Sequence, residues 1–80
     1  MNKKLVVVSS SWCSQCKVLK DQLTRNNIPY FVKDADEEME WCQENGVRGL
    51  PTSFIYGGDE IVKVVVGNKY QEIKEALESV

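Results

Sequence analysis

Two cysteines with two residues between them, Cys13 and Cys16, lie where an apolar run ends and a segment with helical periodicity begins. The apolar run is rich in β-branched residues and predicts a buried strand over residues 4–8. The periodic segment predicts an amphipathic helix from about residue 14 to 26. Backbone N–H groups at the start of a helix are unpaired, and they favour a thiolate over a thiol at Cys13. The pair can close a disulfide within about one helical turn and exchange two electrons.

The rest of the chain continues this alternation of strand-like and helix-like segments. The further elements expected are a strand over residues 30–33, a helix over 34–45, strands over 52–56 and 60–66, and a helix over 69–79. Gly57-Gly58-Asp59 favours a tight hairpin between the last two strands, because glycine adopts the positive φ that such turns need. Strands separated by helices pair in parallel, whereas a hairpin is antiparallel. The sequence therefore predicts an α/β fold, a four-stranded mixed sheet in the order β-α-β-α-β-β-α flanked by three helices.

The apolar residues of the two outer helices should face the sheet. In the first helix these are Val18, Leu19 and Leu23, which fall on one side of an amphipathic helix. In the last helix they are Tyr70, Ile73, Ala76 and Leu77.

Size and charge narrow the class of protein. A chain of 80 residues makes a single domain, 1–80, near the size at which one hydrophobic core suffices. The formal net charge of −2 gives no reason to expect nucleic acid or an anionic membrane as a partner. The first apolar run is shorter than the roughly 7–15 residues of a secretory signal, and no segment approaches the ~20 apolar residues of a membrane span. We therefore expect a cytoplasmic protein, where a Cys-x-x-Cys is more often catalytic or metal-binding than structural.

Two motifs far apart in the sequence resemble those of the thioredoxin family. Residues 12–17, Trp-Cys-Ser-Gln-Cys-Lys, are similar to the thioredoxin active site, and residues 45–52 are similar to the family's cis-proline segment. Gly67 after the last strand and the closing helix also match. The resemblance covers nearly the whole chain and implies a thioredoxin fold and a thiol–disulfide oxidoreductase that reduces protein disulfides.

The chain also departs from the thioredoxin pattern. It lacks the first strand and helix of full thioredoxins, and this compact outline is similar to glutaredoxins and to small thioredoxin/glutaredoxin-like proteins. Ser14 and Gln15 stand between the cysteines, where thioredoxins usually carry Gly-Pro and glutaredoxins Pro-Tyr. Val7 replaces a buried acid with which thioredoxins manage protons. Gly67 is followed by Asn68 and not by the Gly-Gly-x-Asp-Asp pattern with which glutaredoxins hold glutathione.

Cys13 is the expected nucleophile and Cys16 the expected resolving cysteine. The Cys13 thiolate attacks a substrate disulfide, and Cys16 then attacks the mixed disulfide, which releases reduced substrate. Cys16 should be the less exposed of the two because it lies inside the helix. Since the chain has no histidine, the helix terminus, with Lys17 or Lys20, has to lower the pKa of the thiol.

The resemblance also implies a substrate-binding surface beside the cysteines. Pro51 is expected to be cis and to expose the backbone of Leu50, with which an extended substrate segment can pair. The residues assigned to this surface are Trp12, which should cover the disulfide from the side, Leu50, Pro51, Thr52, and Gly67, which should let another chain approach closely.

No bound cofactor or metal is expected, so the electrons come from a partner. Loss of the glutathione pattern favours NADPH through a thioredoxin reductase, whereas the short frame favours glutathione. The expected substrates are proteins that contain disulfides, with ribonucleotide reductase a family-level expectation. The chain is expected to act as a monomer.

Other interpretations of the same residues stay open. A glutathione-dependent glutaredoxin and a non-catalytic redox sensor or adaptor on the same fold are the alternative functions, and an inert structural disulfide is a third interpretation. A zinc site usually needs four nitrogen or sulfur ligands, and beyond the pair only Cys42 remains. We expect Cys42 to be a small buried residue, Trp41 to pack, and the acids of residues 34–38 to form a solvated helix start. Arg48 is either a surface charge or a contact to an acidic partner or a glutathione carboxylate.

Overall fold

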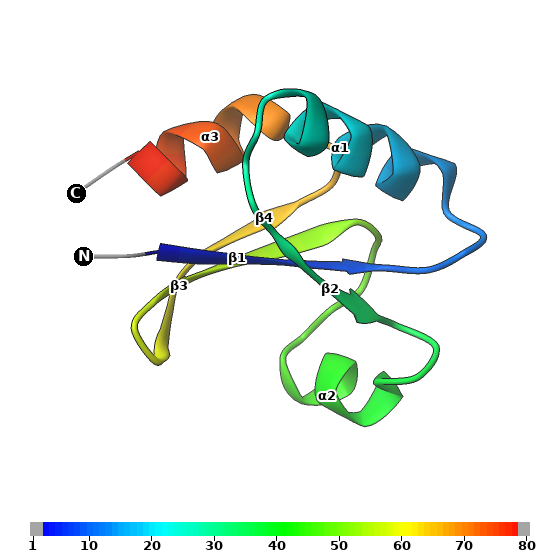
Figure 1. The fold of residues 1–80 in the computed structure, drawn as a ribbon. Coiled ribbons are helices and arrows are strands. Elements are labelled where there is room, and N and C mark those ends of the chain that lie inside the picture. The colour runs from blue at the N-terminus through cyan, green and yellow to red at the C-terminus, as the bar shows by residue number, and fades with distance from the viewer. Residues whose placement is uncertain (1–2, 79–80) are drawn as a thin grey trace.

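Seven elements follow one another in the order that the sequence predicts. The computed structural model describes residues 3–78. Its elements are β1 (Lys3–Ser9), α1 (Ser14–Arg25), β2 (Phe31–Asp34), α2 (Met39–Glu44), β3 (Thr52–Gly57), β4 (Glu60–Val66) and α3 (Tyr70–Glu78). The first and last residues of each element lie within one residue of the predicted ones, except at the start of α2. The predicted end of the last helix, residue 79, lies outside the described residues. Figure 1 shows the sheet as a middle layer, with α1 and α3 on one side and α2 on the other.

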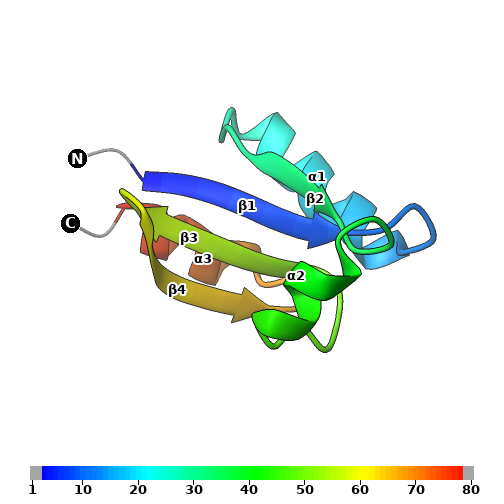
Figure 2. The same cartoon turned by 90° about the horizontal axis from the view of Figure 1, so that it is seen from below.

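The four strands form one mixed sheet, as predicted. Their order is β2-β1-β3-β4, with β1 parallel to β2 and antiparallel to β3, and with β3 antiparallel to β4. Figure 2 looks onto the α2 side of this sheet, with α1 and α3 behind it. The predicted hairpin joins β3 and β4, and Gly58 has a φ of 70° there, a backbone conformation that favours glycine. The two central strands, β1 and β3, carry most of the buried residues of the sheet.

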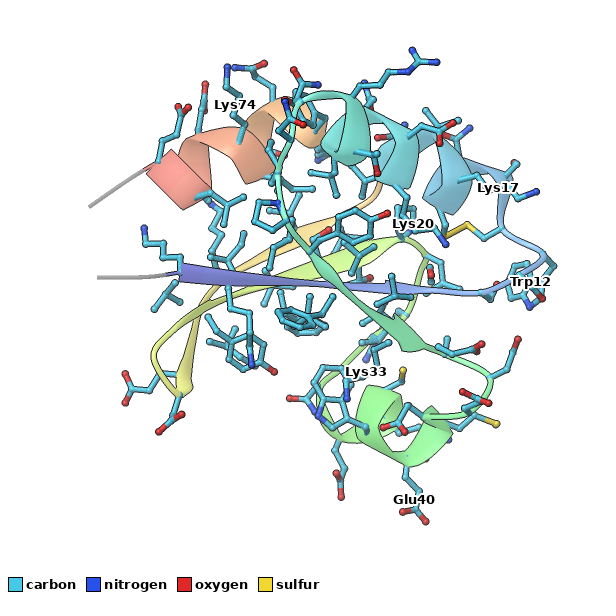
Figure 3. The ribbon with its side chains drawn as sticks, viewed as in Figure 1. Trp12, Lys17, Lys20, Lys33, Glu40 and Lys74 are labelled. Carbon is cyan, nitrogen blue, oxygen red and sulfur yellow. A yellow bond between two sulfur atoms is a disulfide. The ribbon has the colours of Figure 1, made fainter. Side chains whose placement is uncertain are left out.

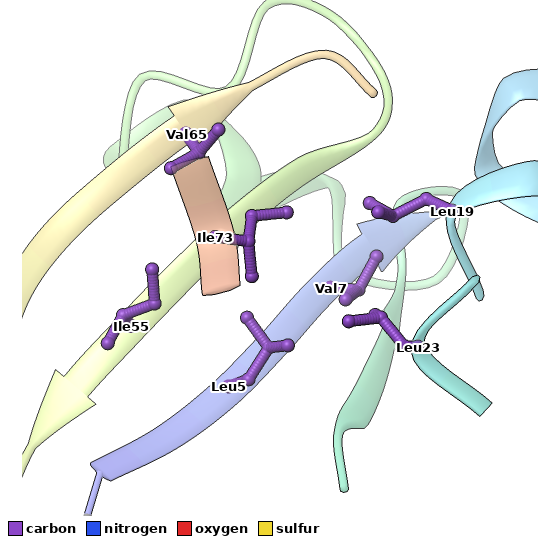
Figure 4. Close-up of a cluster of buried hydrophobic side chains, with 7 residues drawn as sticks. All are labelled: Leu5, Val7, Leu19, Leu23, Ile55, Val65 and Ile73. Atoms are coloured by element: carbon purple, nitrogen blue, oxygen red, sulfur yellow. The ribbon is translucent and has the colours of Figure 1, made fainter. Parts of the chain in front are cut away.

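The larger core lies between the sheet and the two outer helices. It consists of seven buried residues, Leu5, Val7, Leu19, Leu23, Ile55, Val65 and Ile73, shown in Figure 4. Tyr70, Ala76 and Leu77 pack against this cluster, so the predicted apolar face of the last helix is confirmed. Each fully buried Leu or Ile stabilises the fold by about 1.5–3 kcal/mol.

The predicted apolar face of α1 is wrong in one residue. Val18 is 44% exposed, whereas Leu19 and Leu23 are fully buried. Successive residues of a helix are rotated by about 100°, so Val18 turns away from the sheet when Leu19 faces it. The stripe that faces the sheet includes Cys16 instead, which is also fully buried.

The smaller core lies on the other side of the sheet, under α2. It contains Val6, Val8, Cys42 and Phe54, and the Trp41 ring meets the Phe54 ring edge to face, 5.1 Å between centroids. The predictions that Cys42 is buried and that Trp41 packs are therefore confirmed.

The predicted start of α2 is wrong, because the helix begins at Met39 and not at residue 34. Asp34 still belongs to β2, and its Oδ1 accepts the backbone N–H of Asp36 at 2.8 Å. Such a local bond offers the backbone an alternative to the helix. The acidic run therefore forms a turn, and Gly46, with a φ of 71°, follows the end of the short helix.

Candidate active site

The two cysteines enclose the first turn of α1. Cys13 is the N-cap residue, with extended φ and ψ of −95° and 110°, and its Sγ accepts the backbone N–H of Cys16 at 3.2 Å. A disulfide joins Cys13 to Cys16, whose Cα atoms are 5.3 Å apart. Helix N-termini favour a negative charge at this position, because unpaired N–H groups and the helix dipole both point toward it. After reduction, the same setting stabilises a thiolate at Cys13.

The two cysteines differ in access, as the sequence predicts. Cys13 is 8% exposed and Cys16 is completely buried. Cys13 is therefore the more exposed member of the pair, and an incoming disulfide meets it before it meets Cys16. This order of access suits a nucleophile at Cys13 and a resolving thiol at Cys16.

Three connecting segments meet at the end of the sheet that carries the cysteines. The cysteine segment follows β1, the segment with Leu50 and Pro51 precedes β3, and Gly67 follows β4. The three segments lie at the same end of the sheet because Thr52 is the register partner of both Val8 and Val66. Segments far apart in the sequence thus lie at the end of the sheet from which the cysteine segment leaves.

Two hydrogen bonds tie these segments together. The backbone N–H of Gly67 donates to the carbonyl oxygen of Pro51 at 2.7 Å. The side-chain amide of Asn68 donates to Oε1 of Gln15 at 3.3 Å. The second bond joins the residue after Gly67 to a residue between the two cysteines. The sequence does not predict this bond, because two polar amides 53 positions apart carry no sequence signal of a contact.

The residues assigned to substrate binding have different surroundings. The Leu50–Pro51 peptide is cis, and Gly67 has a φ of 91°. Pro51 and Thr52 are buried, and the Thr52 hydroxyl donates to the carbonyl oxygen of Gly49 at 2.5 Å. Leu50 is half-buried and packs against the smaller core. Trp12, by contrast, is 71% exposed and stands on the loop before Cys13 (Figure 3).

The two lysines named with the cysteines point in different directions. Lys17 is exposed, whereas Lys20 is half-buried and its Nζ lies 3.5 Å from the Ser9 hydroxyl. In the view of Figure 3, Lys20 lies on the side of α1 that faces the sheet and Lys17 extends into solvent.

The remaining candidates lie away from the disulfide. Within residues 3–78, no group of three or more His, Cys, Asp or Glu side chains is placed to hold a metal ion. Cys42 lies on α2, on the other side of the sheet, where burial raises the pKa of its thiol and the nearby Lys33 partly offsets that rise. Arg48 is exposed. None of the helices in the described part of the chain is long and apolar enough to cross a membrane.

Comparison with known sequences gives a family. The sequence model of the family "Thioredoxin" matches residues 1–79. Thioredoxin-1 of Schizosaccharomyces pombe is 29% identical over 83 residues, covering 95% of this chain and 81% of that protein. A protein disulfide-isomerase of Aspergillus oryzae is 33% identical over 82 residues, covering 86% of this chain but 16% of that longer protein.

Comparison with solved structures agrees. Mitochondrial thioredoxin 3 of Saccharomyces cerevisiae, in its oxidised form, superposes with a TM-score of 0.87 at 19% identity, over 99% of this chain and 79% of that chain. A chain in the crystal structure of a ferredoxin:thioredoxin reductase and thioredoxin f2 complex superposes with a TM-score of 0.81 at 25% identity, over 96% of this chain and 76% of that chain.

Proposed function

The chain belongs to the thioredoxin family and has the thioredoxin fold, and from that premise we propose that it reduces protein disulfides as a small thioredoxin. The observation that carries the proposal is the Cys13–Cys16 disulfide at the N-terminus of α1, with Cys13 as the N-cap residue and the more exposed of the two. The hydrogen bond from the Gly67 N–H to the Pro51 carbonyl oxygen supports it, because it joins the two other segments at this end of the sheet.

The reaction runs in two displacements. The Cys13 thiolate attacks one sulfur of the substrate disulfide, and the other substrate sulfur leaves as a thiolate. Cys16 then loses its proton and attacks Cys13 Sγ, which releases the second substrate sulfur and closes the Cys13–Cys16 disulfide. Two electrons pass from the protein dithiol to the substrate, and the substrate thiolates take up protons from solvent.

The substrate surface surrounds this disulfide. In our proposal an extended substrate segment pairs with the backbone of Leu50, which Pro51 presents and Thr52 anchors through its bond to Gly49. The exposed indole of Trp12 offers an apolar contact. The space beside Gly67 is open to an incoming backbone, since a Cβ built at this position would meet no atom within 4 Å. The positive φ of Gly67 disfavours any residue whose side chain would fill that space.

The electron donor is a thioredoxin reductase, supplied with electrons by NADPH, and no prosthetic group is needed. Asn68, which follows Gly67 in the position where glutaredoxins begin their glutathione pattern, is bonded to Gln15. That bond engages the amide nitrogen of Asn68, which leaves this N–H group less free to hold a peptide such as glutathione. The alternative donor is glutathione, which the short frame of the chain favours.

The proposal extends to partners and location. The substrates are proteins with accessible disulfides, and ribonucleotide reductase is the family-level candidate. The net charge of −2 speaks against nucleic acid as a partner, and a dithiol that must be kept reduced suits the cytoplasm. We propose that the protein acts there as a monomer.

A coupled assay tests the function and the donor together. Oxidised protein is mixed with a disulfide substrate and with either NADPH and thioredoxin reductase, or NADPH, glutathione and glutathione reductase, and the loss of NADPH is followed. Turnover with the first system alone supports a small thioredoxin, and turnover with the second alone identifies a glutaredoxin. The Cys13→Ser variant is the control for both. If wild type matches this variant in both systems and also with the host's own reductase, the protein is a redox sensor or adaptor and not a reductase.

A further inference from the structure

The second displacement requires the thiol of Cys16 to lose its proton inside the protein. Cys16 is completely buried, yet it must become a thiolate before it can attack Cys13. Burial disfavours a thiolate, and a positive charge near Cys16 would offset that cost. The chain has no histidine, and Val7, which packs with Leu19 and Leu23 of α1, offers no proton acceptor.

Lys20 lies on the same helical stripe as Cys16. Cys16, Leu19, Lys20 and Leu23 are spaced i, i+3, i+4 and i+7, the spacing of one helix face, and the other three are completely buried. Residues at i and i+4 are neighbours on a helix, and side chains lean toward the helix N-terminus. The aliphatic part of Lys20 therefore runs back toward Cys16.

The contact to Ser9 fixes where the ammonium group lies. Lys20 Nζ is 3.5 Å from Ser9 Oγ, and Ser9 is the last residue of β1 and only 2% exposed. The segment that leads to the cysteines starts at this residue. The ammonium is thus held between α1 and the end of β1, and in Figure 3 Lys20 lies on the side of α1 that faces the sheet.

The other charged groups around this position are turned to solvent or engaged elsewhere. Lys17 and Asp21 on α1 are exposed. Asp34, the register partner of Ser9, is half-buried and its Oδ1 accepts the N–H of Asp36. Lys69 at the start of α3 is exposed and pairs with Glu72 at 3.8 Å.

We propose that Lys20 is a positioning residue for the resolving step, whose ammonium stabilises the thiolate of buried Cys16. The inference rests on the proposed function. In the mixed disulfide, the Cys16 thiol releases its proton to solvent. The thiolate forms a bond to Cys13 Sγ, the bond from Cys13 to the substrate sulfur breaks, and that sulfur leaves with the electron pair. An opposite charge within about 4–6 Å lowers the pKa of an acid by roughly 1–3 units.

Dithiobis(nitrobenzoate) separates the two steps, because each step releases one coloured thiolate. Reduced protein is mixed with this reagent, in a Cys42→Ala background so that only two thiols remain. The first burst reports the attack by Cys13 and the second reports resolution by Cys16. Lys20→Met should slow the second burst about tenfold at neutral pH and raise its pH midpoint by about one unit, and it should slow the first burst less, because the N-terminus of α1 also stabilises the Cys13 thiolate.

Lys17→Met is the matched control, since it removes the same charge from an exposed position on the same helix. It should change the second burst much less than Lys20→Met, whereas Lys20→Arg should restore that burst. Lys20→Gln is a second neutral variant for the case that Lys20→Met does not fold. A second burst with the wild-type rate and pH midpoint in the folded neutral variant would overturn the proposal, and so would equal effects of Lys17→Met and Lys20→Met. Wild type that shows both bursts but accepts electrons from neither donor would refute the proposed function and not the role of Lys20.

Discussion

Cys13 and Cys42 are equally exposed, at 8% each, but lie in regions of opposite character. Cys13 caps α1 and its Sγ accepts a backbone N–H at 3.2 Å. Cys42 lies within α2, where its own N–H donates to Glu38 in the helical pattern and its side chain is packed beside Val8 and Phe54. Solvent exposure therefore does not distinguish the two thiols.

The backbone around each cysteine does distinguish them. A helix N-terminus supplies unpaired donors that stabilise a thiolate, whereas an apolar cluster supplies none. Burial accordingly raises the pKa of the Cys42 thiol. A cysteine of this chain therefore takes a redox role at the N-terminus of a helix and a packing role inside one.

The largest expected effect comes from removing each thiol in turn. Cys13→Ser should reduce disulfide turnover to the uncatalysed background, because a hydroxyl is not ionised at neutral pH and cannot act as the nucleophile. Cys42→Ala should keep the wild-type rate. The coupled NADPH assay measures both, and turnover that survives in Cys13→Ser would break the comparison.

Removing the resolving thiol should stop the reaction half-way. Cys16→Ser should accumulate a covalent mixed disulfide between Cys13 and the substrate, since no second thiol lies within reach to release it. Intact-mass measurement under non-reducing conditions detects this adduct. The Cys13→Ser variant serves as the comparison, and an equal yield of adduct there would place the nucleophile elsewhere.

The packing on the two sides of the sheet should differ in its energetic weight. Leu23→Ala empties a completely buried position in the larger core and should lower the free energy of unfolding by about 2–5 kcal/mol. Cys42→Ala removes a single sulfur atom from the smaller core and should cost less. Denaturant unfolding of the oxidised proteins gives both values, and equal losses would contradict the ranking of the two cores.

The smallest effect is a dependence of stability on alkaline pH. Since the pKa of the Cys42 thiol is higher in the folded than in the unfolded chain, the unfolded state loses this proton first as the pH rises. The contribution of this thiol to the free energy of unfolding is complete below its pKa in the unfolded chain. That contribution is lost as the pH rises through its pKa in the folded chain. Oxidised wild type should therefore lose stability on that rise relative to oxidised Cys42→Ala. Parallel curves for the two proteins would show that burial does not hold Cys42 as a thiol.

Much of the fold follows from local sequence. The β-branched run before Ser9, the glycines at 57 and 58 and the apolar periodicity of α3 act through neighbouring residues, and the elements that they predict are present. The start of α1 at the cysteines follows in the same way.

The errors arise where another part of the chain, or a local bond, decides the outcome. Val18 and Leu19 are both apolar, and only the orientation of α1 on the sheet exposes one of them. The hydrogen bond from the Asp36 N–H to the Asp34 side chain favours a turn, so that α2 begins later in the sequence, at Met39. The bond between Asn68 and Gln15 depends on how three segments meet at the end of the sheet, which no local pattern specifies.

The central claim is that electrons leave through Cys13 and Cys16 while Cys42 stays a thiol. The most direct test mixes reduced protein with an excess of a protein disulfide, quenches the mixture with acid, alkylates the free thiols and locates the labels by peptide mass. We expect the peptides of Cys13 and Cys16 to be joined by a disulfide in every molecule that has turned over, with Cys42 alkylated. Reduction of the substrate with Cys42 in a disulfide, or with Cys13 and Cys16 both alkylated, would contradict the account.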